Sequence, residues 1–87
     1  MTNEQAKAKM RELAEATANL FPEDFQTAKG ELFRDKIAGI RIQWENELPT
    51  AYNNTKMVLK HFTAKMDRMA ATAARHEAKG WKSISRV

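Results

Sequence analysis

The sequence contains no cysteine, and among its 87 residues there are only three glycines and two prolines. Without cysteine the chain can form no disulfide, no thiolate zinc site and no cysteine nucleophile. With 43% hydrophobic and 30% charged residues, the composition is that of a globular protein and not of a disordered chain. The length fits one compact domain, and we expect a single helical domain over residues 1–82 with a flexible tail over 83–87.

Long hydrophobic runs are also missing. The first twenty residues lack an uninterrupted apolar core, and no segment approaches the roughly 18 apolar residues that a membrane span needs. The absence of cysteine fits a reducing compartment. We therefore expect a soluble, cytoplasmic protein.

Groups that could perform catalysis or hold a metal are scarce. The only histidines, His61 and His76, are fifteen positions apart and so lie too far apart along one helix to chelate the same ion. The sequence has no phosphate loop, dinucleotide fingerprint or nucleophile elbow. Methionines at helical spacing are more typical of adaptable core filling than of a soft-metal site. The sequence predicts a protein that is not an enzyme and needs no cofactor or metal.

The N-terminal segment has the pattern of a helix with one narrow apolar stripe. Thr2 and Gln5 have the spacing of a capping box, which can start a helix there. The stripe that follows steps by four and three residues, through Ala6, Met10, Leu13, Thr17 and Leu20. Because it contains few large side chains, we expect this helix to be the least firmly held.

The central segment has the strongest apolar face, and Pro49 is a plausible stop. Its members recur at helical spacing: Phe33, Ile37, Ile40, Trp44 and Leu48. Leu32, Gly39 and Ile42 form a weaker second strip, which either receives the first helix, with Gly39 permitting close approach, or is an exposed contact surface. Before this segment, residues 22–29 could form a short fourth helix that ends at Gly30.

The third segment is the most regular part of the chain. Asn54 is a suitable cap, and the seam that follows has heptad-like spacing, through Leu59, Phe62, Met66, Met69, Ala73 and His76. Gly80 is placed to end the helix in a left-handed conformation, with Trp81 folding back on the last turn. We expect an all-α fold, a small bundle of three main helices or four with the short one, whose main antiparallel hairpin joins the second and third segments.

Charge is distributed unevenly along the chain. Residues 1–53 carry seven Lys or Arg and nine Asp or Glu, a net charge of −2, whereas residues 54–87 carry eight against two, a net charge of +6. On a helical projection, most of these cations fall opposite the apolar seam, and Asp67 and Glu77 are predicted to lie outside their row. We call this row the basic ridge: Lys56, Lys60, Arg68, Arg75, Lys79 and Lys82.

Two interpretations of the basic ridge remain open at this stage. An amphipathic helix needs a solvated face, and cations favour helix C-termini, so the ridge could be no more than the wet side of the helix. Alternatively, clustered cations bind a phosphate backbone or an acidic protein surface. The ridge lacks residues that read bases, so contact with nucleic acid would be weakly sequence-dependent. Insertion into a membrane surface is disfavoured, because the apolar seam faces the second segment.

These observations together predict a non-catalytic binding protein that docks through the basic ridge on a polyanionic surface. That surface would be nucleic acid or an acidic patch of a nucleic-acid-handling complex, and the protein would act as an accessory protein or inhibitor. The alternative is a protein-interaction module or homodimer that uses apolar surface, namely Leu32, Ile42 and Met57, or the methionine-lined seam, while the ridge is merely solvated.

Overall fold

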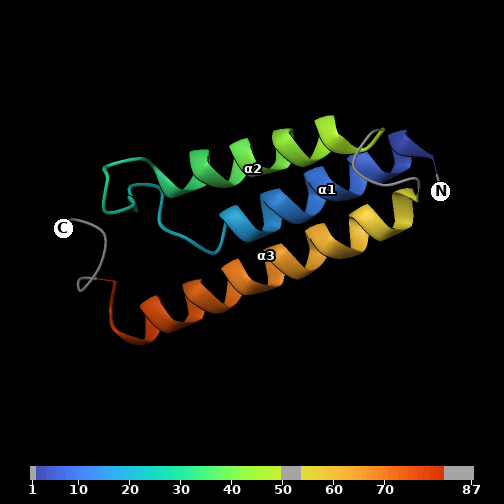
Figure 1. Cartoon of the computed structure of the whole chain (residues 1–87). Coiled ribbons are helices and arrows are strands. Elements are labelled where there is room, and N and C mark those ends of the chain that lie inside the picture. The colour runs from blue at the N-terminus through green and yellow to red at the C-terminus, as the bar shows by residue number, and fades with distance from the viewer. Residues whose placement is uncertain (1, 50–53, 82–87) are drawn as a thin grey trace.

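The computed structural model describes residues 2–49 and 54–81, and these form three α-helices and no strand. The helices are α1 (Asn3–Ala18), α2 (Phe33–Glu47) and α3 (Thr55–Ala78). Figure 1 shows α1 between the other two, with α2 running in the opposite direction to α1 and α3. The all-α expectation is confirmed.

The N-terminal caps predicted for the first and third helices are both present. The Thr2 side chain accepts a hydrogen bond from the Gln5 amide, and the Gln5 side chain accepts one from the Thr2 amide, which completes the capping box. At the start of α3 the Asn54 side chain accepts from the Lys56 amide. These caps satisfy amides that would otherwise lack intrahelical partners.

The closest helix packing involves α1. It packs against both α2 and α3, whereas α2 and α3 approach each other much less closely along their backbones. Small residues explain this, because Ala6 and Ala14 on the buried face of α1 let the neighbouring helices come near. The expectation that the first helix is the least firmly held stays a prediction, although α1 packs against both other helices. The hairpin of the second and third segments stays a prediction, since residues 50–53 lie outside the described part of the chain.

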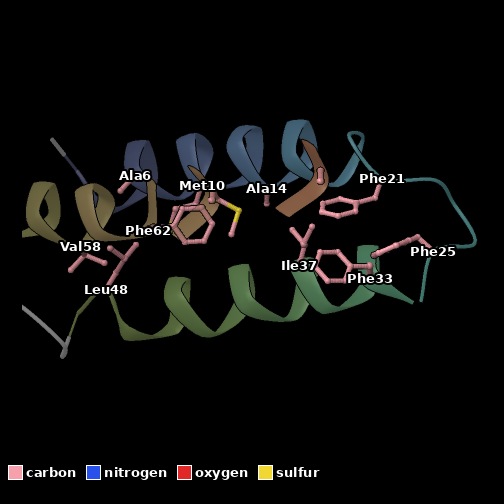
Figure 2. Close-up of a cluster of buried hydrophobic side chains, with 12 residues drawn as sticks. Ala6, Met10, Ala14, Phe21, Phe25, Phe33, Ile37, Leu48, Val58 and Phe62 are labelled. Carbon is pink, nitrogen blue, oxygen red and sulfur yellow. The ribbon is translucent and has the colours of Figure 1, made fainter. Parts of the chain in front are cut away.

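The core is a row of side chains between the three helices, drawn in Figure 2. At one end, Met10 of α1 and Phe62 of α3 are fully buried, and Trp44 of α2 contacts the Phe62 ring edge-on at 6.1 Å between centroids. At the other end, Phe21, Phe25 and Phe33 pack together, with the Phe21 and Phe33 centroids 4.3 Å apart. Burial of these large side chains is the main stabilising contribution.

Residues 22–29 do not form the short fourth helix. The Thr27 hydroxyl accepts hydrogen bonds from the Lys29 and Glu31 amides, and the Thr27 amide donates to the Glu31 carbonyl. Such local bonds compete with helix formation, and Gly30 completes the turn with φ of +87°. The loop returns on itself through an isolated bridge between Gln26 and Leu32, which places Phe25 in the core.

The second apolar strip of α2 does not receive α1. Ile42 is 49% exposed and Leu32 is 39% exposed. A Cβ added at Gly39 would meet no atom within 4 Å, so no helix approaches closely at that position. The interpretation that this strip receives the first helix is therefore wrong, and the strip is an exposed surface.

The C-terminal end of α3 forms the predicted left-handed stop. The Gly80 amide donates to the Glu77 carbonyl and the Trp81 amide donates to the His76 carbonyl, which is the hydrogen-bond pattern of a Schellman motif. Both Gly80 and Trp81 have positive φ, at +77° and +63°. The Trp81 ring folds back onto Phe25, with centroids 5.1 Å apart. The α3 terminus is thereby joined to the phenylalanine cluster.

Replacement of glycine by alanine should act in opposite directions at two positions. Gly39→Ala should raise the free energy of unfolding by roughly 0.5–1 kcal/mol, because an exposed helix interior gains from alanine and no neighbour is displaced. Gly80→Ala should lower it by about 1 kcal/mol, because alanine is strained at positive φ. Urea denaturation followed by circular dichroism measures both. A destabilised Gly39→Ala variant would show that another segment packs closely there.

Candidate binding surface on α3

The amphipathic pattern of α3 positions the basic ridge on the solvent side. The buried residues of α3 are Val58, Phe62, Met66 and Ala73. Five predicted ridge residues are exposed along the same helix: Lys56, Lys60, Arg68, Arg75 and Lys79. The sixth, Lys82, lies outside the described residues. Because the apolar seam already faces the core, its methionines fill internal space and offer no open groove to a second copy.

No acid within residues 2–49 and 54–81 forms an ion pair with these five cations. In the described ranges, 2–49 and 54–81, the only ion pairs join Glu45 to Arg41, at 2.6 Å, and Glu45 to Arg11, at 3.7 Å. Both pairs lie on α1 and α2. The charge asymmetry seen along the sequence therefore persists on α3 as exposed cations without an ion-pair partner in the part of the chain that the structure describes.

The basic ridge is not free of acids over its whole length, which corrects the helical projection. Asp67 lines an open hollow of about 500 Å³ together with Lys56 and Lys60. No ion pair joins Asp67 to either lysine in the part of the chain that the structure describes. Its carboxylate nevertheless lowers the positive potential at this end of the ridge.

The C-terminal part of the ridge has a more uniform charge. Arg68, Arg75 and Lys79 extend over about 16 Å of helix at a rise of 1.5 Å per residue. A guanidinium nitrogen of Arg75 donates to the Thr72 hydroxyl at 3.2 Å, and that hydroxyl donates to the Arg68 carbonyl at 3.1 Å. These bonds restrict the orientation of Arg75. Positioned arginine side chains lose less conformational entropy when they bind an anion.

His76 has a role that the sequence analysis missed. It is the last residue of the seam predicted from the sequence, and its ring lies 5.6 Å from Phe25 and 6.4 Å from Trp81 between centroids. Its Nδ1 is buried and has no hydrogen-bond partner among the described residues. Burial, followed by the neighbouring charges of Arg75 and Lys79, lowers the pKa of His76. The signal in the sequence was the position of His76 in the heptad-like repeat.

The described ranges contain neither a metal site nor a membrane-spanning helix. No group of three His, Cys, Asp or Glu side chains there could hold a metal ion. None of the three helices combines the length and the apolar character needed to cross a bilayer. Comparison with protein-family models, curated proteins and solved structures finds no match to this chain.

Protonation of His76 should weaken the fold. Because its pKa in the folded protein is lowered below the usual 6.5, the unfolded chain takes up a proton first as the pH falls. The free energy of unfolding contributed by His76 is therefore complete above pH 6.5, decreases as the pH falls through the folded-state pKa, and then levels off. Urea denaturation between pH 8 and pH 4 measures this decrease.

His76→Gln should remove that part of the pH dependence, since glutamine does not titrate. His61→Gln is the matched control, because it removes the other histidine and should keep the decrease. Equal pH profiles for the wild type and His76→Gln would contradict the assignment.

Proposed function

We propose that this protein is a non-catalytic helical binding protein that docks through the basic ridge of α3 on a polyanionic surface. The binding partner would be nucleic acid or an acidic patch of a nucleic-acid-handling complex. The protein would act by stoichiometric association, as an accessory protein or an inhibitor. A soluble protein of the cytoplasm, with no cofactor and no membrane partner, belongs to the same proposal.

One observation carries this proposal: exposed cations line the solvent side of α3 without ion-pair partners among the described residues. Favourable interactions with the C-terminal end of the helix explain Arg75 and Lys79 in part, but they do not reach Lys60 or Arg68, which lie at least two turns further back. The row of cations extends further along α3 than interactions with the C-terminal end of the helix can explain. This extra length is consistent with binding of an anion.

The chemistry of the ridge favours contact with a backbone over recognition of bases. Between Lys56 and Lys79 the sequence has no Asn or Gln, and its only ring other than histidine belongs to Phe62, which is buried. Amide side chains and exposed aromatic rings are the groups that identify and stack on bases. We therefore propose binding with little sequence preference.

The two parts of the ridge should contribute unequally. Asp67 lines the same hollow as Lys56 and Lys60, whereas Arg68, Arg75 and Lys79 are exposed and form no ion pair within residues 2–49 and 54–81. Arginine also makes bidentate contacts with phosphate and carboxylate, which lysine cannot. We propose that the arginine-rich C-terminal part supplies most of the affinity, on a scaffold in which α2 and α3 form an antiparallel hairpin.

Affinity for a nonspecific DNA duplex should fall steeply with salt. If three or four phosphates are contacted, raising the salt from about 50 mM to about 200 mM should weaken binding by about 40- to 150-fold. Fluorescence anisotropy of a labelled duplex measures this dependence. Polyglutamate, added as a competitor of the duplex, tests binding to an acidic protein surface. A protein that binds neither polyanion at low salt would rule out the proposal.

Charge reversal on two faces provides the matched comparison. Arg68→Glu with Arg75→Glu, and Lys9→Glu with Lys29→Glu, each lower the formal net charge from +4 to zero. All four positions are exposed, so both variants should fold. The ridge variant should lose binding, whereas the other variant should keep most of it. An equal loss in both would mean that net charge, and not the ridge, determines binding.

A second candidate is an apolar interaction surface, favoured by the exposure of Leu32, Ile42 and Met57 at 39%, 49% and 42%. Leu32 caps α2, Ile42 lies ten residues further along the same helix and Met57 lies on α3, and scattered apolar residues are normal on soluble proteins. Retained partner binding after charge reversal of the ridge, together with its loss in an Ile42→Ser variant, would favour this alternative.

A further inference from the structure

A groove between α1 and α2, on a different part of the molecule from the basic ridge, contains a positively charged side chain without a carboxylate partner. Its volume is about 200 Å³, and both helices contribute to its walls. Small side chains make it hollow, because Ala14 and Ala18 of α1 lie across from Ala38 of α2. Figure 1 shows these two helices side by side along their lengths.

Three arginines and one acid, Glu15, line the groove, and two of the arginines are already paired with another carboxylate. Arg41 and Arg11 share the carboxylate of Glu45, with the closer contact of 2.6 Å made by Arg41. The side chains of Arg41 and Glu45 are only 20% and 12% exposed, so the pair with Glu45 holds Arg41 in place in the wall. An incoming anion would have to compete with Glu45 at this end of the groove.

Arg34, at the opposite end of the groove, is different. Its Nε and one terminal nitrogen donate to the Phe21 carbonyl at 3.2 and 2.7 Å, and no carboxylate pairs with it within residues 2–49 and 54–81. The carbonyl takes two of the five N–H donors of the guanidinium, which leaves three. The bonds to Phe21 also hold the group in one orientation. A half-buried, positioned guanidinium with unused parallel donors is suited to a planar carboxylate.

We propose that this groove binds a small aliphatic carboxylate. The carboxylate would accept hydrogen bonds from Arg34, and the aliphatic chain would lie on the floor formed by Ala14, Ala38 and the buried Ile37. The volume is below that of sites for drug-sized ligands, so a nucleotide or larger cofactor does not fit. The ligand chemistry combines one negative charge with a short apolar chain, which distinguishes this site from the polyanion surface of α3.

Hexanoate is a suitable probe, with NMR amide shifts as the readout. Saturable shifts should appear at groove residues of α1 and α2, with a dissociation constant on the order of 1 mM. Butyrate, which has two fewer methylenes, should bind about tenfold more weakly if the apolar floor contributes. Hexanol, which lacks the charge, should not bind measurably. Inorganic phosphate that binds as well as hexanoate would show that the floor has no role and would overturn the proposal.

Two variants locate the site. Arg34→Gln should weaken hexanoate binding by at least tenfold, but it also removes bonds to the Phe21 carbonyl. Ala38→Leu fills the groove and leaves Arg34 and its carbonyl contact in place, so it should block binding in a folded protein. Ala64→Leu, at an exposed alanine of α3, and Arg68→Gln are the matched controls and should keep binding. Undiminished binding by folded Ala38→Leu, or shifts centred on α3, would overturn the proposal.

Discussion

The burial of α1 between α2 and α3 is the constraint on which the rest of this structure depends. All three helices contribute side chains to one core, and both α2 and α3 pack against α1. Ala6 and Ala14 allow the close approach, and Met10 fills the space between them against Phe62. Because both other helices pack on α1, the orientation of the basic face of α3 is determined by the same contacts that determine the core.

The acids and cations of the chain are segregated by this arrangement. Glu45 engages two arginines on the α1–α2 side, so its negative charge is balanced there and not on α3. The cations of α3 remain opposite the core, beyond the reach of those acids. The surplus on α3 therefore follows from the fold as well as from composition, because the buried face of α3 turns its cations toward solvent.

Periodicity and local chemistry were enough to predict much of the fold. The capping box at Thr2, the cap at Asn54 and the left-handed stop at Gly80 depend on residues close in sequence, and each was confirmed. The predicted short helix over residues 22–29 was wrong because the Thr27 hydroxyl captures two amides, a competition that apolar spacing does not reveal. Local signals are reliable here wherever the partner groups are local.

Features that depend on contacts between helices could not be obtained from the sequence. The burial of His76 against Phe25 requires the loop after α1 to fold back over the end of α3, and nothing near His76 in the sequence indicates that loop. The groove beside Arg34 likewise combines one wall from each of two helices whose register is set by the core. Asp67 is a simpler case, because at about 100° per residue its position on the helix falls between those of Lys56 and Lys60.

The aromatic cluster links the candidate surface to the stability of the whole bundle. Trp81 and His76 connect the last turn of α3 to Phe25, so the segment that carries Arg75 is held at its end by the core and not by its helix alone. An isolated helix would fray at its terminus, and its cations would lose their fixed spacing. Anchoring of the terminus keeps these cations in register with one another, which lowers the conformational entropy lost when a partner with a regular array of anions binds.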